Sequence, residues 1–343
     1  MHADARRWFT QRSSHLADWP LPAVLDRKRD TRVSVVLPAL NEQATVGPIV
    51  AAIRRELVER VGLVDELVVM DSGSTDATAA VAAAAGARVV HREEVLPEFD
   101  PLPGKGEVLW RSLAATTGDV LVFVDSDLRQ FTPSYVVGLL GPLLADPGVH
   151  LVKACYDRPL LPRRGLAGLA ERVGTRALPV RPAAGGRVTE LVARPLLNLH
   201  WPQLAGIAQP LSGEYAARRT LLERLPFPTG YGVELGLLVD ALHAVGLDGL
   251  AQVDLRRRRH RHQSDARLGV MASEIMQTAL RRLEGEDRLW LAEPVSTGLT
   301  QFERVAGRYV ARSTEVRTLD RPPLVTVPSY LAATRTMQRT AAS

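Results

Sequence analysis

The chain has 343 residues, 46% hydrophobic and 24% charged, a balance typical of a globular protein with one large core or two smaller ones. No run reaches the roughly 18 apolar residues that a membrane span needs, and the first twenty residues lack the apolar segment of a signal peptide. The single cysteine, Cys155, excludes an internal disulfide framework and fits a reducing compartment. We therefore expect a cytoplasmic protein without a membrane span.

The net charge of +5 and the isoelectric point of about 9.7 suggest an anionic partner, either nucleic acid or small phosphorylated molecules. Lysine occurs only at Lys28, Lys105 and Lys153, so most of the 43 basic residues are arginine. Charge alone does not choose between these partners. Zinc-ligand spacing, a helix-turn-helix signal and a basic stripe with interleaved aromatics are all missing from the sequence, which disfavours nucleic acid.

The first half of the chain alternates between predicted strands and helices. Apolar runs predict strands, and longer segments with helical periodicity follow them. The order is βαβαβαβ, which predicts an α/β fold with a mostly parallel, Rossmann-like sheet and ligands at the carboxyl ends of its strands. The predicted strands are 33–38, 66–70, 88–91 and 119–124, and the predicted helices are 41–60, 77–86 and 106–116.

Three polar clusters, at 38–42, 71–76 and 125–127, directly follow predicted strands and should converge on one rim of the sheet. In the third cluster, Asp125 and Asp127 are one residue apart, a spacing that places two strand side chains on the same side. Two such carboxylates can hold a hard divalent cation whose remaining positions take diphosphate oxygens. Turn chemistry would use the same residue types, but three clusters on one rim favour a nucleotide-sugar site.

A fourth motif, 103–107, places Lys105 between two glycines. Glycines let the backbone approach a ligand closely, and a lysine there would neutralise a diphosphate as a point charge. The alternative is an exposed surface loop without a ligand. The motif is not a P-loop, because it lacks the spacing and the hydroxyl residue that binds magnesium.

Together with later motifs at 185–191, 209–211, 213–215 and 230–234, these segments resemble the family 81 retaining glycosyltransferases over roughly residues 30 to 265. The resemblance implies a GT-A fold with a nucleotide-sugar part and a smaller acceptor part around one cleft. We expect four parts: an N-terminal extension at 1–30, the nucleotide-sugar part at 31–150, the acceptor and metal part at 151–265, and C-terminal helices and tail at 266–343.

The resemblance also implies roles for individual residues. Asp127 and His260 would bind Mg2+ or Mn2+, although the arginine-rich run 256–261 around His260 is by itself typical of a solvated or nucleic-acid-binding patch. Glu234 would act as a base or bind a sugar hydroxyl, and the backbone carbonyl of Leu211 would stabilise the oxocarbenium-like sugar. Glu234 could equally stabilise a helix start. The nucleoside and its phosphates would contact Pro38, Ala39, Leu40, Glu42, Ser72, Lys105, Asp125 and Ser126.

For the acceptor, the resemblance points to the loop that contains Gly186, Arg187 and Thr189, and to His262. A guanidinium grips a phosphate through two parallel hydrogen bonds, which suits 3-phosphoglycerate. A glycine-rich turn with an exposed arginine is the alternative. Ser212, His262 and Gln263 depart from the pattern of the family, which leaves the acceptor contacts and the acceptor itself open.

The expected reaction is transfer of glucose from UDP-glucose to the 2-hydroxyl of 3-phosphoglycerate, with retention at the anomeric carbon and without a protein nucleophile. Alternatives are a mannosyl or broad-specificity enzyme that uses GDP-sugars, another acceptor, and a non-catalytic nucleotide- or nucleic-acid-binding protein. Residues 157–184 receive no role. A helix at 271–283 and an extended tail from Ser313 follow; such a tail needs a surface to pack against, and the family implies a homodimer.

Overall fold

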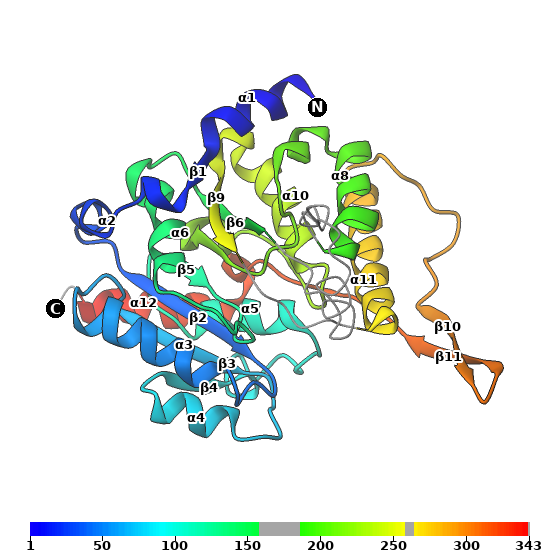
Figure 1. Ribbon diagram of the computed structural model, residues 1–343, viewed down its shortest axis with the longest axis horizontal. Coiled ribbons are helices and arrows are strands. Elements are labelled where there is room, and N and C mark those ends of the chain that lie inside the picture. The colour runs from blue at the N-terminus through cyan, green and yellow to red at the C-terminus, as the bar shows by residue number, and fades with distance from the viewer. Residues whose placement is uncertain (158–185, 258–263, 342–343) are drawn as a thin grey trace, which may run out of the picture.

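The computed structural model describes residues 1–157, 186–257 and 264–341, which form an eight-stranded central sheet flanked by helices (Figure 1). Its strand order is β1-β9-β6-β7-β5-β2-β3-β4, and only β7 runs antiparallel to its neighbours β5 and β6. The mostly parallel sheet is therefore confirmed. The strands are β1 Ser13–His15, β2 Val33–Ala39, β3 Glu66–Asp71, β4 Arg88–His91, β5 Val120–Phe123, β6 Leu151–Asp157, β7 Tyr215–Arg218 and β9 Leu250–Arg257.

Helices cover both faces of the sheet, so each central strand is buried on both sides, as a parallel sheet requires. Along β2, Val35 and Leu37 belong to one hydrophobic core and Val36 belongs to the other. One core packs against α2 Leu21–Lys28, α3 Val46–Ile53, α4 Thr78–Ala84 and α6 Ser134–Ala145. The other packs against α1 Ala3–Arg12, α5 Lys105–Ala114, α8 Arg194–His200, α9 Arg219–Leu222, α10 Val233–Val245, α11 Asp265–Gly285 and α12 Pro328–Ala341.

All four predicted strands are present as β2 to β5, but two local predictions are wrong. The helix expected from Asn41 begins only at Val46, because Asn41 has a positive φ of 57° and residues 41–45 form a turn. Past Ile53 this helix continues as a π-helical segment, Arg54–Glu59. Strand β5 ends at Phe123, so Asp125 and Asp127 lie in the following loop and strand alternation does not set their direction.

The C-terminal part differs from the expected extended tail. It forms a hairpin, β10 Gly298–Val305 and β11 Arg308–Glu315, that projects from the body (Figure 1). The chain then runs extended through β12 Asp320–Arg321, which pairs with β8 Phe227–Pro228, and ends in the unpredicted helix α12. The tail therefore packs on its own chain. None of the described helices is long and apolar enough to cross a membrane, and residues 158–184 lie outside the described ranges.

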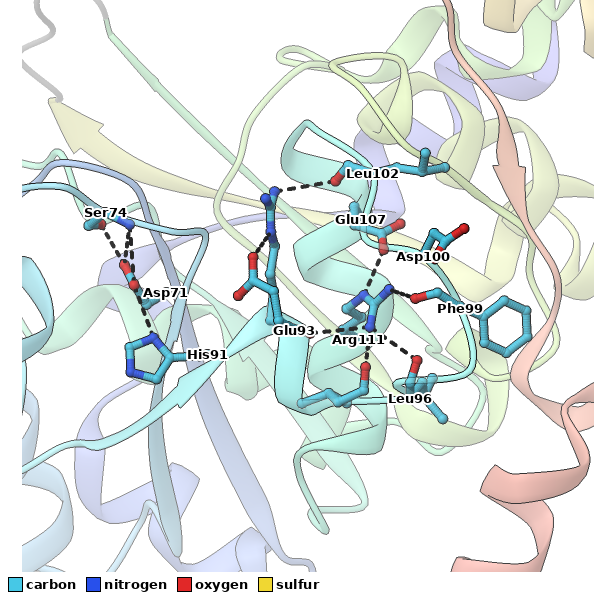
Figure 2. A network of polar contacts seen from close by, with 12 residues as sticks. Asp71, Ser74, His91, Glu93, Leu96, Phe99, Asp100, Leu102, Glu107 and Arg111 are labelled. Carbon is cyan, nitrogen blue, oxygen red and sulfur yellow. Dashed lines mark hydrogen bonds and ion pairs between the residues drawn. The ribbon is translucent and has the colours of Figure 1, made fainter.

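A buried charge network fixes the connection between β4 and α5 (Figure 2). Glu107 and Arg111 on α5 are fully buried, and the Arg111 Nε donates to Glu107 Oε1 at 2.6 Å. The same guanidinium donates to main-chain carbonyls of the connection, including Phe99 at 2.6 Å and Leu96 at 3.2 Å. From the C-terminal segment, Arg321 donates to the Glu107 carboxylate at 2.8 Å. The network thus holds the loop that leads into Lys105.

Replacing Arg321 with methionine should leave the buried Glu107 carboxylate short of one partner and lower the free energy of unfolding by about 3 kcal/mol or more. The matched control is Arg312→Met, since Arg312 pairs with Glu303 on the exposed hairpin, and its loss should stay below about 1 kcal/mol. Urea denaturation followed by circular dichroism measures both. Equal losses in the two variants would contradict the role given to the network.

Candidate active site

The three polar clusters predicted to share one rim are joined by direct hydrogen bonds. Strands β3, β2 and β5 are neighbours in the sheet and parallel, so their carboxyl ends meet at one edge. The Ser72 amide donates to the Ala39 carbonyl at 2.9 Å, and the buried Ser126 hydroxyl donates to the Pro38 carbonyl at 2.6 Å. The loops after β2, β3 and β5 therefore form one structural unit.

The turn after β2 determines which side chains face outward. Asn41 tolerates the left-handed backbone, and its side-chain oxygen accepts a hydrogen bond from the Thr75 amide at 2.8 Å. The Glu42 amide donates to Thr78 Oγ1 at 2.8 Å. As a result the Leu40 side chain is 54% exposed while Ala39 is buried, so Leu40 offers a side chain to a ligand and Ala39 offers chiefly its backbone.

A buried carboxylate supports the turn after β3, and sequence reasoning missed it. Asp71 is 2% exposed, and its carboxylate accepts a hydrogen bond from the Ser74 hydroxyl and lies 3.2 Å from His91 Nδ1 (Figure 2). The Ser74 amide also donates to Asp71 at 3.3 Å. These contacts hold the backbone on either side of Ser72. Asp71 belongs to the polar cluster at 71–76, but nothing in the sequence placed His91 beside it.

Lys105 lies at the centre of the site. Its Nζ is 2.6 Å from Asp125 Oδ1 and 2.9 Å from Glu234 Oε1, and its side chain is only 16% exposed. Burial alone would lower the pKa of Lys105, but the Asp125 and Glu234 carboxylates outweigh it and hold that pKa well above its ordinary value. The lysine therefore stays charged, and the alternative of an exposed surface loop is wrong.

The contacts of Lys105 connect three distant parts of the chain. Lys105 begins α5, Asp125 follows β5, and Glu234 lies in the first turn of α10. The structure thus brings together three residues that the sequence predicted separately as site residues. Because each charge is largely removed from water, their mutual pairing favours one arrangement of the three segments.

The glycines beside Lys105 allow close packing of the backbone. Gly104 has a φ of 106°, and a Cβ there would lie 2.5 Å from the Thr229 carbonyl oxygen. A Cβ on Gly106 would lie 1.7 Å from the Pro228 carbonyl oxygen. The start of α5 therefore packs tightly against the segment that leads into Glu234.

The turn at 209–214 lies against the same lysine. A Cβ on Gly213 would lie 2.4 Å from both Lys105 Nζ and Asp125 Oδ2. The Ser212 amide donates to the Gln209 carbonyl at 3.1 Å, and its fully buried hydroxyl lies 3.3 Å from Glu214 Oε2. The backbone around Leu211 is therefore held by internal hydrogen bonds beside the charged centre.

The predicted acceptor residues lie on a separate segment that begins the described range at Gly186. Arg187 is half-exposed and forms an ion pair with the strongly exposed Asp265 at the start of α11. Thr189 is buried and begins a π-helical segment, Thr189–Ala193. Two further candidates, His260 and His262, fall outside the described residues.

The candidate metal ligand Asp127 follows β5, two residues after Asp125, and is partly exposed. In the ranges that the structure covers, no group of three or more His, Cys, Asp or Glu side chains is arranged to hold a metal. A carboxylate oxygen at this rim still has the donor chemistry that Mg2+ and Mn2+ prefer. A site of one protein carboxylate completed by other ligands fits these residues.

Comparison with known proteins identifies the family. A family model described as "Glycosyl transferase family 2" matches residues 34–159. The chain is 49% identical over 321 residues to glucosyl-3-phosphoglycerate synthase of Mycolicibacterium smegmatis, an alignment that covers 94% of this chain and 98% of that protein. The chain belongs to the glucosyl-3-phosphoglycerate synthase family. It is accordingly a glycosyltransferase, and the non-catalytic alternative is set aside.

Solved structures agree with this membership of the glucosyl-3-phosphoglycerate synthase family and confirm the GT-A fold. Mannosyl-3-phosphoglycerate synthase from Rubrobacter xylanophilus matches with a TM-score of 0.83 and 39% identity, covering 94% of this chain and 97% of that one. Glucosyl-3-phosphoglycerate synthase from Mycobacterium tuberculosis, solved with Mn2+, UDP and glucosyl-3-phosphoglycerate, matches with a TM-score of 0.74 and 46% identity, covering 90% and 95%.

Gly213→Ala should force the new methyl group against the Lys105–Asp125 pair and displace both side chains. Because a shift of about 1 Å in a site can cost a hundredfold in rate, turnover should fall by about that factor. Gly285→Ala is the matched control, since a Cβ at this end of α11 would have no atom within 4 Å apart from its chain neighbours and the backbone of its own helix. Steady-state kinetics and melting temperatures distinguish the variants. Near-normal turnover in Gly213→Ala would contradict the packing described.

Proposed function

We propose that this chain transfers glucose from UDP-glucose to the 2-hydroxyl of 3-phosphoglycerate and retains the anomeric configuration. The proposal is carried by Lys105, a buried charged lysine at the rim where the loops after β2, β3 and β5 meet. A chain with this site is 49% identical to a glucosyl-3-phosphoglycerate synthase over almost its whole length. A solved relative contains UDP and the glucosyl product in one complex.

The rim after β2 and β3 would bind the uridine and ribose. Leu40 presents an exposed apolar side chain, while Pro38 and Ala39 form the end of the strand beneath it. Ser72 and Glu42 stand on the two loops that are joined by hydrogen bonds. A flat base packed on Leu40 with polar groups at its edge is the arrangement that these residues favour.

The diphosphate would lie next to Lys105, whose positive charge is held in place before substrate binds. Asp125 and Ser126 would position the adjacent ribose and phosphate. Asp127, with His260, would hold a divalent ion here, and that ion would supply positive charge to the departing diphosphate. Because Lys105 is already oriented by two carboxylates, little reorganisation is needed when the leaving group gains charge.

Asp125 and Glu234 are both paired with Lys105, which supports transfer without a protein nucleophile. A carboxylate neutralised by a lysine at 2.9 Å, as Glu234 is, is a weak nucleophile and a good acceptor for a sugar hydroxyl. The acceptor oxygen would attack the anomeric carbon on the face from which UDP leaves, and its proton would pass to a donor phosphate oxygen. The Leu211 carbonyl would stabilise the positive charge that develops on the sugar.

The acceptor phosphate would bind Arg187, together with Gly186, Thr189 and His262. One partner of Arg187 is Asp265, a strongly exposed carboxylate in an ion pair of the kind that contributes little in water. A phosphate dianion would compete effectively for the same guanidinium. Acceptor binding would then release Asp265 at the start of α11.

Transfer of mannose from GDP-mannose is a second candidate, because the mannosyl enzyme of Rubrobacter xylanophilus has a TM-score of 0.83 to this structure. The identity to that protein is lower, 39% against 49% for the glucosyl relative. The sequence identity therefore favours glucose, and the donor is a question for direct measurement.

The predicted homodimer, cytoplasmic location and four-part division of the chain stay predictions. The hairpin projects from the body (Figure 1). It supports the homodimer, since three of its large apolar side chains, Phe302, Val305 and Tyr309, are exposed. A second copy of this chain is the occupant we propose for that surface.

The purified protein, incubated with Mn2+ or Mg2+ and 3-phosphoglycerate, should form a hexosyl-phosphoglycerate from UDP-glucose, and mass spectrometry detects it. GDP-glucose and GDP-mannose are tested in parallel. Product from GDP-mannose alone would favour the second candidate. Consumption of donor without a phosphoglycerate product would point to another acceptor.

The control for this assay is a pair of variants at the two ends of β5. Asp127→Ala, at the carboxyl end, should reduce turnover by about a hundredfold or more while the circular dichroism spectrum is unchanged. Asp119→Ala, at the amino end, removes a carboxylate from the opposite edge of the sheet and should keep turnover. Equal turnover in both variants would contradict a site at the carboxyl end of β5.

A further inference from the structure

Lys153 is a buried cation that none of the roles above uses. It lies in the middle of β6, is 3% exposed, and donates a hydrogen bond to the main-chain carbonyl of Ser212. Its ammonium group lies 5.0 Å from the ring centre of Tyr215 on the neighbouring strand β7. A lysine in such a place is held by specific partners, because an ammonium group is costly to bury.

The partner of Lys153 belongs to the turn at the charged centre. Ser212 stands between Leu211, whose carbonyl is proposed to face the sugar, and Gly213, which lies against Lys105 and Asp125. The turn is thus held by a lysine on each side: Lys153 binds the Ser212 carbonyl, and Lys105 packs against Gly213. Rotation of the Ser212–Gly213 peptide would break the first contact and disturb the second.

The composition of the chain gives independent support. Only three of its 43 basic residues are lysine. All three are largely buried in ion pairs or hydrogen bonds: Lys28 with Asp65 at 2.9 Å, Lys105 with its two carboxylates, and Lys153 with the turn. Each of the three lysines therefore serves as a compact point charge held by specific partners.

We propose that Lys153 is a positioning residue for glucosyl transfer, which fixes the 209–214 turn so that the Leu211 carbonyl and Lys105 keep their places at the donor sugar. The inference rests on the proposed function. It assigns Lys153 no contact with substrate, and its effect should appear in turnover rather than in the binding of either substrate.

Charged groups face Lys153 from every side. Glu214 precedes β7, Glu234 comes from α10, Lys105 from α5 and Asp125 from the loop after β5, while Gln252 opposite it on β9 is neutral. Burial, followed by repulsion from Lys105, lowers the pKa of Lys153 to about 8, although the attraction of Glu234 opposes this shift. The side chain is therefore charged below about pH 8 and neutral above it.

Loss of this charge with rising pH should weaken the hydrogen bond from Lys153 to the Ser212 carbonyl, since a neutral amine is a weaker donor to a carbonyl than an ammonium group. Wild-type kcat should accordingly fall on the alkaline side with a midpoint at about pH 8. Protonated Lys153 holds the turn, and because its pKa is lowered, this charged form is lost as the pH rises.

The test compares Lys153→Met with Lys28→Met, which removes a buried lysine from an ion pair with Asp65 far from the site. Wild-type turnover of UDP-glucose and 3-phosphoglycerate is measured first, so a failure of the proposed function is seen separately. In Lys153→Met, kcat should fall about a hundredfold, both KM values should change little, and the alkaline fall in kcat should disappear. Lys28→Met should lose stability but keep kcat.

Lys153→Gln is the second variant, because it keeps a hydrogen-bond donor without the charge. It should retain more turnover than the methionine variant and should show no alkaline fall, and it serves as the test if Lys153→Met does not fold. Wild-type kcat in Lys153→Met, an equal loss of kcat in Lys28→Met, or an unchanged alkaline fall in either Lys153 variant would overturn the proposal.

Discussion

The site depends on one ion-paired lysine. Lys105 cannot be buried without partners, and the two carboxylates it binds come from segments more than a hundred residues apart, the loop after β5 and the first turn of α10. Its pairing therefore joins the rim formed by the loops after β2, β3 and β5 to the start of α10. Close packing at Gly104, Gly106 and Gly213 leaves the lysine little freedom to move.

A second buried network lies behind this centre and supports it. Glu107 and Arg111 belong to the helix that Lys105 begins, and Arg321 reaches them from near the C-terminus. Tail residues also pair with β8, directly before the segment that leads to Glu234. The C-terminal segment therefore supports both α5, which begins with Lys105, and the segment that leads to Glu234.

The sequence predicted the features that local patterns determine. Apolar runs placed β2, β3 and β5 correctly because a strand buried on both faces needs continuous hydrophobic residues, and β4, an edge strand that buries chiefly Val90, was found from its short apolar pair. Parallel order then implied that the clusters after β2, β3 and β5 would meet, and they do. Motifs predicted Lys105, Asp125 and Glu234 individually as site residues. They did not predict that Lys105 pairs with both carboxylates.

The features that the sequence did not predict depend on distant partners. The turn at Asn41 replaces a helical start because Ser74, Thr75 and Thr78 satisfy its polar groups. In the sequence, Lys153 only interrupts an apolar run, because its partner, the Ser212 carbonyl, lies far along the chain. Likewise, nothing in the sequence around Arg321 shows that it donates a hydrogen bond to the buried Glu107 carboxylate. Such contacts leave no periodic signal in the sequence.

Lys105 and Glu234 act as one unit in this site, and a double-mutant cycle on kcat/KM measures their coupling. The variants are Lys105→Met, Glu234→Gln and the two combined, assayed with UDP-glucose and 3-phosphoglycerate. The double variant should lose much less than the sum of the single losses, with a coupling energy of about 1 to 3 kcal/mol. Losses that add to within about 0.5 kcal/mol would contradict it.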